Sequence, residues 1–149
     1  MRNLMRSKFY VNFHEIHETE NSVYMVIDYL KGGELSKMTK NGSIFSESVV
    51  RPFLQNLLTG LMLIHSKGIM HRDLKPENII LRKKNCIEEV SIIDFGLASF
   101  VDVKKYLYKR CGTPGYVAPE ILSYKDVERS EFYNAKCDLF SAGVIFYML

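Results

Sequence analysis

Three short motifs, in one order along the chain, constrain the fold of this 149-residue sequence more than any other feature. The first spans His71 to Asn78 (HRDLKPEN), the second Asp94 to Gly96 (DFG), and the third Gly112 to Glu120 (GTPGYVAPE). Any one of them alone fits a surface turn or a cluster of charges. All three together, in this order and spacing, are hard to explain by chance. The combination therefore predicts one site assembled from loops that lie far apart in the sequence.

These motifs resemble the catalytic loop, the magnesium-binding motif and the substrate-docking segment of eukaryotic protein kinases. The resemblance runs from about Phe9 to the last residue and implies a kinase-like α+β fold. On this interpretation residues 1–149 form a partial kinase domain. About 1–30 would be the end of the small-lobe sheet and the hinge, and 31–149 the helical large lobe, truncated within the helix after the docking segment. Three segments (NSVYMVIDYLKGGEL, GTPGYVAPE and CDLFSAGVIFYML) are most similar to the calcium/calmodulin-dependent group.

The resemblance implies chemical roles for five residues. Asp73 would orient the substrate hydroxyl and accept its proton, and Lys75 would contact the γ-phosphate of ATP. A lysine at this place resembles the serine/threonine branch of the family. Asn78 and Asp94 would supply hard oxygen ligands to Mg²⁺, which is held jointly with the nucleotide phosphates. Thr113 would hydrogen-bond near Asp73 and Lys75 and help to select a Ser or Thr acceptor.

A further set of residues is implied to surround the nucleotide. The hinge backbone that bonds adenine would lie at Leu30 and the gatekeeper at Ile27, while Ile80 would pack under the adenine with support from Leu35. The nucleotide-binding candidates are Ile27, Asp28, Leu30, Glu34, Leu35, Lys75, Glu77, Asn78, Ile80 and Asp94.

Glu34 has two interpretations that stay open: contact with a ribose or a basic substrate side chain, or a solvated acid at the start of a helix. With Glu77 also in place, a preference for substrates with Arg before the phosphorylated residue is a hypothesis.

Several neighbours have structural roles in the same scheme. His71 and Phe95 would stack in a column of side chains that links the lobes, with Phe13 above them. Asp138 would anchor the catalytic loop from the last helix. We expect His65 to be a packed, hydrogen-bonded residue and not a catalyst.

Hydrophobic spacing predicts the local structure. Apolar residues at helical spacing indicate a helix within Ser46–Lys67, with Ser48 as its N-cap, Pro52 near its start and Gly68 at its end. We expect strands at 9–16, 22–30, 69–70, 79–81 and 90–93, a mobile loop at 97–110 and a buried helix at 138–149.

Composition narrows the functional classes. A net charge of +3, with 20 Lys and Arg against 17 Asp and Glu, is too balanced to indicate nucleic-acid binding. The most apolar stretch, Leu139 to Leu149, is too short to span a membrane. Three widely spaced cysteines form no disulfide or zinc pattern and indicate reduced thiols, so we expect the cytoplasm or the nucleus.

The sequence also departs from a complete kinase. No Gly-rich loop appears before Phe9, and no strand of the Val-Ala-Ile-Lys type supplies a phosphate-holding lysine. We therefore expect a fragment whose last helix leaves Val144, Ile145 and Leu149 partly uncovered, so that the isolated chain aggregates. The alternative is a catalytically inactive kinase-like docking module. A purely structural role has no positive feature to support it.

Regulation is a further hypothesis. Lys109 stands where related loops often carry a phosphorylated Thr, so Arg72 would meet a cation there. This favours activation by a segment outside the chain, of the calcium/calmodulin type, over phosphorylation of the loop.

Overall fold

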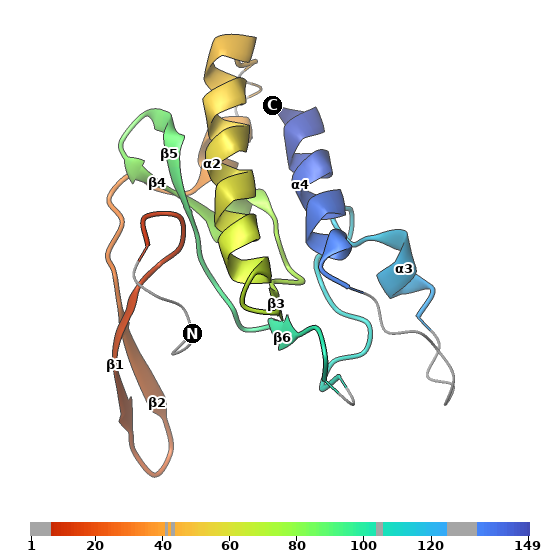
Figure 1. Ribbon diagram of the computed structural model, residues 1–149. Helices are drawn as coiled ribbons and strands as arrows, with labels where there is room; N and C mark the ends of the chain where they lie inside the picture. Colours follow the sequence, from red (N-terminus) through yellow and green to blue (C-terminus); the bar gives the residue numbers. More distant parts are fainter. Residues whose placement is uncertain (1–6, 41, 43, 104–105, 125–133) are drawn as a thin grey trace.

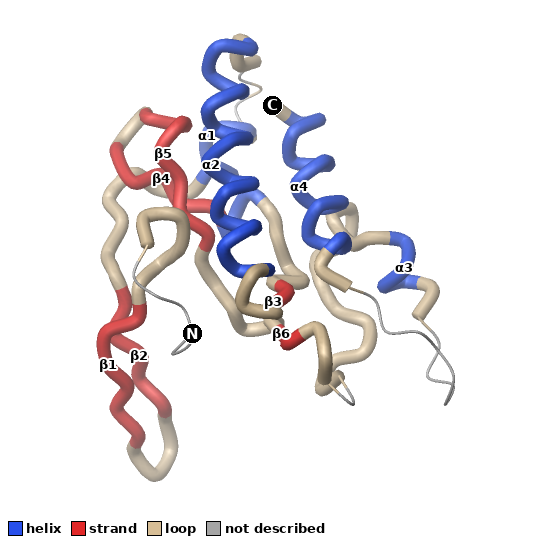
Figure 2. Tube along the Cα trace, in the orientation of Figure 1, coloured by secondary structure: helices blue, strands red, loops and turns tan. Residues whose placement is uncertain are grey.

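The structure, a computed structural model, describes residues 7–40, 42, 44–103, 106–124 and 134–149. These residues form a mixture of helices and small antiparallel sheets (Figures 1 and 2), which confirms the predicted α+β class. The elements are β1 (Phe13–Glu18), β2 (Val23–Ile27), α1 (Leu35–Thr39), α2 (Glu47–His65), β3 (Ile69–Met70), the 3-10 helix η1 (Pro76–Asn78), β4 (Ile79–Lys83), β5 (Cys86–Ile92), β6 (Ser99–Phe100), α3 (Pro119–Leu122) and α4 (Lys136–Met148).

Helix α2 is the centre of the main hydrophobic core. Its buried residues Phe53, Leu57, Leu61 and Ile64 recur every three or four positions, so they share one face of the helix. Strand β5 and helix α4 pack against α2, as Figure 1 shows. The sequence-based helix is confirmed, but its N-cap is Ser46 and not Ser48.

Three antiparallel pairs of strands precede or follow the loops that carry the sequence motifs. Strands pair as β1 with β2, β3 with β6, and β4 with β5, each pair antiparallel. The β1–β2 hairpin extends away from the rest of the chain (Figure 1), and all five residues of β2 are exposed. Strand β3 leads into the catalytic loop, and β5 leads into the Asp-Phe-Gly segment.

The hinge segment lies directly on β4. The amide of Gly32 donates to the carbonyl oxygen of Leu81 at 3.0 Å, and the amide of Leu81 donates to that of Gly33 at 2.8 Å. A Cβ atom on Gly32 would clash with the Leu81 backbone, so this approach requires glycine.

Two predictions about the second half of the chain need correction. Part of the expected loop after Leu97 is strand β6, whose pairing with β3 depends on a partner some thirty residues earlier in the chain and leaves no local sequence signal. Helix α4 is only half buried: Ile145 is completely buried, contrary to expectation, while Phe146 and Tyr147 are exposed. None of the described helices combines the length and apolar composition that crossing a bilayer requires.

Candidate active site

Three side chains from two loops meet in a closed set of polar contacts. The hydroxyl of Thr113 donates to Oδ1 of Asp73 at 2.6 Å, and Nζ of Lys75 donates to the Thr113 hydroxyl at 2.8 Å. Lys75 also lies 3.2 Å from Oδ2 of Asp73. The carboxylate, the ammonium group and the hydroxyl therefore face the same small volume, as the sequence predicted for Asp73, Lys75 and Thr113.

Asn78 fixes the position of the Asp73 carboxylate from the other side. Its side-chain amide donates to the backbone carbonyl of Asp73 at 2.8 Å and to Oδ2 at 3.2 Å. Because Asn78 is buried and follows Pro76 in the rigid 3-10 turn, this side chain has little freedom to move. The loop that carries Thr113 is held close by Gly112, whose φ of 114° and closeness to the carbonyl of Arg72 exclude a side chain.

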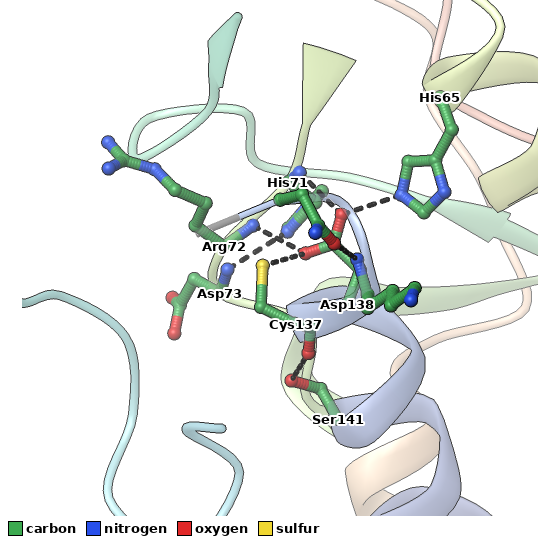
Figure 3. A network of polar contacts seen from close by, with 9 residues as sticks. His65, His71, Arg72, Asp73, Cys137, Asp138 and Ser141 are labelled. Carbon is green, nitrogen blue, oxygen red and sulfur yellow. Dashed lines mark hydrogen bonds and ion pairs between the residues drawn. The ribbon is translucent and has the colours of Figure 1, made fainter. Parts of the chain in front are cut away.

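A completely buried carboxylate, that of Asp138 in α4, holds the catalytic loop by hydrogen bonds to two of its backbone amides. Oδ2 accepts from the amide of His71 and Oδ1 accepts from the amide of Arg72, both at 2.8 Å. Figure 3 shows His65, at the end of α2, reaching the same carboxylate, with Nε2 at 2.8 Å from Oδ2. These contacts hold Arg72 at a φ of 67°, which costs energy for a residue other than glycine. The predicted roles of Asp138 and His65 agree with this geometry.

The pKa of Asp138 depends on two opposing effects. Burial alone would raise it, but the hydrogen bond from His65 and the interactions with His71 and Arg72 outweigh burial and lower it below the ordinary value of 3.8. The folded protein therefore stabilises the ionised form.

A pH dependence of stability follows from this lowered pKa. Because the unfolded state binds the proton more tightly, the contribution is complete above about pH 5 and is lost as the pH falls below about 4. We expect the difference in unfolding free energy between wild type and Asp138→Asn to narrow as the pH falls from about 5.5 to about 3. Denaturant titrations at several pH values measure this difference, and a constant difference would refute the assignment.

The Asp-Phe-Gly segment is linked to the catalytic loop through His71. Nε2 of His71 lies 2.8 Å from the carbonyl oxygen of Ile93 and Nδ1 lies 3.3 Å from the amide of Asp73, so the network places the proton on Nε2. The rings of His71 and Phe95 pack edge to face at 5.1 Å, as predicted. Phe13 and Phe95 line the same cavity.

The predicted metal ligands offer the oxygen atoms that Mg²⁺ prefers. The side-chain amide nitrogen of Asn78 donates to Asp73, so the side-chain carbonyl oxygen is the atom that could bind a metal ion. Asp94, at a φ of 60°, is exposed, and its Oδ1 accepts from the amide of Gly96 at 3.0 Å. The two are neighbours through a backbone bond from the amide of Ile93 to the carbonyl of Asn78. In the described part of the chain, no three or more His, Cys, Asp or Glu side chains gather in a group that could hold a metal ion.

The predicted nucleotide contacts divide into two regions. Ile27 and Asp94 line one cavity of about 520 Å³ between the β1–β2 hairpin and residues 93–100. Leu35 is completely buried, and the backbone bridge between Glu34 and Ile80 brings their two segments together. The remaining hinge candidate, Leu30, is half-buried.

The Asp28 side chain forms hydrogen bonds with residues around the start of β1. Its Oδ2 accepts from the side-chain amide of Asn12 at 2.6 Å, and Oδ1 lies 2.7 Å from Nε2 of His14. Burial would raise the Asp28 pKa, but these contacts lower it. Its backbone amide is paired as well, because it donates to the carbonyl oxygen of Asn12 at 3.1 Å, so neither the side chain nor the amide of Asp28 is available to a nucleotide in this arrangement.

Glu34 and Glu77, the two acidic residues considered for contact with the substrate, are partly exposed. Glu34 is the N-cap of α1 and accepts a hydrogen bond from Ser36 at 2.8 Å, which fits the helix-start interpretation without excluding the other. Glu77 lies 4.0 Å from Lys40 and, after burial, is the second cause of the raised pKa of Tyr116.

The contact set of Asp73, Lys75 and Thr113 is called the polar triangle below, and replacing Thr113 tests it directly. Thr113→Ala removes both the donor to Asp73 and the acceptor for Lys75. On the kinase activity that the sequence resemblance implies, we expect the rate of phosphoryl transfer to fall roughly 10- to 100-fold. Thr113→Ser keeps the hydroxyl and should stay within about threefold of wild type. Steady-state kinetics measure the effect. Thr59→Ala, which removes an exposed hydroxyl on α2, is the matched control, and equal losses in Thr113→Ala and Thr59→Ala would contradict the role.

Comparison with known proteins agrees with this geometry. The family model described as "Protein kinase domain" matches residues 1–149. The chain is 42% identical over 140 residues to "Probable serine/threonine-protein kinase 2" of Plasmodium falciparum, covering 94% of this chain and 26% of that protein. It is 37% identical over 150 residues to "CBL-interacting protein kinase 10" of Oryza sativa, covering 99% of this chain and 31% of that protein.

A third relative is "CBL-interacting serine/threonine-protein kinase 15" of Arabidopsis thaliana, 38% identical over 149 residues, which covers 98% of this chain and 33% of that protein. The chain thus spans between a quarter and a third of the length of these relatives. With the catalytic loop, the Asp-Phe-Gly segment and their contacts in place, the chain belongs to the protein kinase family.

Proposed function

We propose that this chain carries the catalytic residues of a serine/threonine protein kinase, which transfers the γ-phosphate of ATP to Ser or Thr of protein substrates with Mg²⁺. The observation that carries the proposal is the contact set of Asp73, Lys75 and Thr113, with Asn78 fixed beside it. Phosphoryl transfer depends on positioning and charge stabilisation more than on covalent chemistry, and this arrangement supplies both.

The residues have separate tasks in the transfer. The Asp73 carboxylate orients the substrate hydroxyl and takes its proton as the new O–P bond forms and the bond to ADP breaks. Lys75 moves its charge from Asp73 to the transferred phosphoryl group. Mg²⁺, when bound, neutralises the nucleotide phosphates, and Asn78 and Asp94 would hold it.

A panel of peptides tests the proposal. The protein at its natural length, supplied with ATP and Mg²⁺, should label peptides with a central Ser or Thr and leave Tyr peptides unlabelled. Transfer only to Tyr would overturn the serine/threonine assignment. Tight binding of a partner protein without any transfer would favour the docking-module alternative.

Substrate preference is a further part of the proposal. Glu34 and Glu77 are partly exposed carboxylates near the site, so they favour peptides with Arg before the acceptor residue. An array in which Arg→Ala at that place leaves the labelling unchanged would refute this preference. Regulation by calcium-dependent partners outside this chain, a role in signalling, and a cytoplasmic or nuclear location are proposed from the sequence resemblance and the cysteine pattern alone.

A further inference from the structure

A buried arginine joins the catalytic loop to the segment that follows Asp-Phe-Gly. Arg72 is only 5% exposed. Its Nε donates to the carbonyl of Leu97 at 2.7 Å, and one terminal nitrogen donates to the carbonyl of Tyr108 at 2.9 Å. In Figure 3 the guanidinium group extends away from Asp138, while its own backbone amide is held by that carboxylate. One side chain thus contacts the backbone at both Leu97 and Tyr108.

The ring of Tyr106 lies against this guanidinium group. The distance from Cζ of Arg72 to the ring centroid is 5.1 Å, within the range of a cation–π interaction. Tyr106 is 2% exposed, and its ring also packs edge to face on Tyr124 at 6.0 Å. Burial raises the pKa of Tyr106 to about 12, against the lowering effect of Arg72, so the phenol is neutral near pH 7.

Tyr106 belongs to a second hydrophobic cluster, to which the docking segment contributes Ala118. Its other buried members are Met70, Ala118, Ile121 and Cys137, from β3, the loop before α3, α3 itself and α4. A tyrosine that is buried among these elements and faces the Arg72 guanidinium connects three places: the catalytic loop, the segment 97–110 and the docking segment.

We propose that Tyr106 is a positioning residue that holds residues 97–103 and 106–110 against the catalytic loop through Arg72, without a phosphate group on these residues. The negative face of the ring and the two carbonyl groups together stabilise the buried guanidinium charge. The loop that carries Thr113 starts directly after this segment, so its order maintains the contact of Thr113 with Asp73 and Lys75. The activity consequence rests on the proposed kinase function, whereas the structural consequence does not.

Substitutions at two tyrosines separate this role from general packing. Tyr106→Phe keeps the aromatic face, and we expect kcat within about twofold of wild type. Tyr106→Leu keeps an apolar side chain but removes that face, and kcat should fall roughly tenfold with the KM for ATP unchanged. Tyr108→Leu is the matched control, because its side chain is half exposed and its backbone carbonyl remains, so it should behave as wild type.

Hydrogen exchange provides a readout that does not depend on catalysis. In Tyr106→Leu, amides of residues 97–103 and 106–110 should exchange about tenfold faster, while those of α2 stay unchanged. Arg72→Lys leaves the Tyr106 side chain in the core but removes the planar group that lies on it, so it should loosen the same amides. That variant decides the question if Tyr106→Leu fails to fold.

The outcomes distinguish the two proposals. If phosphatase-treated enzyme with no phosphate detectable by mass spectrometry keeps its activity and Tyr106→Leu loses it, the inference is supported. If removal of phosphate from the segment abolishes activity, or if Tyr106→Leu matches Tyr106→Phe in both kcat and exchange, the inference is wrong while the kinase function stands. If wild type labels no peptide, the proposed function fails, and the exchange rates alone decide the role of Tyr106.

Discussion

Asp73→Asn should lower kcat for peptide phosphorylation by about 10³-fold and leave the KM for ATP nearly unchanged. Oδ2 of Asp73 lies 3.2 Å from both Nζ of Lys75 and the amide nitrogen of Asn78. Replacing that oxygen with an NH2 group places a hydrogen-bond donor opposite two other donors, Nζ of Lys75 and the amide nitrogen of Asn78. Rotating the new amide only transfers the conflict to Oδ1, which accepts from Thr113 at 2.6 Å. The variant therefore loses both the proton acceptor and the geometry around it.

The control for this prediction is Asp102→Asn. Asp102 is exposed and lies outside the polar triangle, so the same change of charge and shape there should leave kcat within about twofold. Unfolding measured by circular dichroism should show that Asp73→Asn remains folded, since Asp73 is only partly buried. A kcat for Asp73→Asn within about tenfold of wild type would show that Asp73 is not the residue that orients the hydroxyl.

The motifs predicted which side chains lie together better than hydrophobic spacing predicted the local structure around them. Asp73, Lys75 and Thr113 were assigned roles from motifs, and the structure brings them into contact although Thr113 lies some forty residues beyond the other two. The motif residues are informative because their chemistry limits which residue types can stand there. The positions of Asp28 and Glu34 are less restricted, and their side chains form hydrogen bonds with Asn12, His14 and Ser36.

Long-range packing accounts for what the sequence did not predict. The start of α2 was placed two residues late because Ser46 and Ser48 are both acceptable N-caps, and their hydroxyl groups in fact bond to each other at 2.8 Å. The loop after Leu97 has no apolar periodicity, so neither strand β6 nor the burial of Tyr106 could be predicted from its own residues. Both depend on partners that approach from other elements.

Asp138→Ala should have the largest effect on stability, a loss of roughly 3–5 kcal/mol in the free energy of unfolding. The substitution leaves the amides of His71 and Arg72 buried without their acceptor. It also removes the contact that holds Arg72 at its positive φ, so the catalytic loop loses its anchor and activity falls as well. Equilibrium denaturation of the protein at its natural length measures the loss.

Two further variants show which contact of Asp138 matters most. Asp138→Asn can accept only one of the two amide hydrogens and should lie between alanine and wild type. His65→Ala removes one hydrogen bond from outside the loop, leaves both amides paired, and should cost only about 1 kcal/mol. If His65→Ala were as destabilising as Asp138→Ala, the His65–Asp138 pair, and not the two loop amides, would carry the stabilisation. A greater loss for Asp138→Ala assigns the stabilisation to the two loop amides, because they are the contacts that only Asp138 supplies.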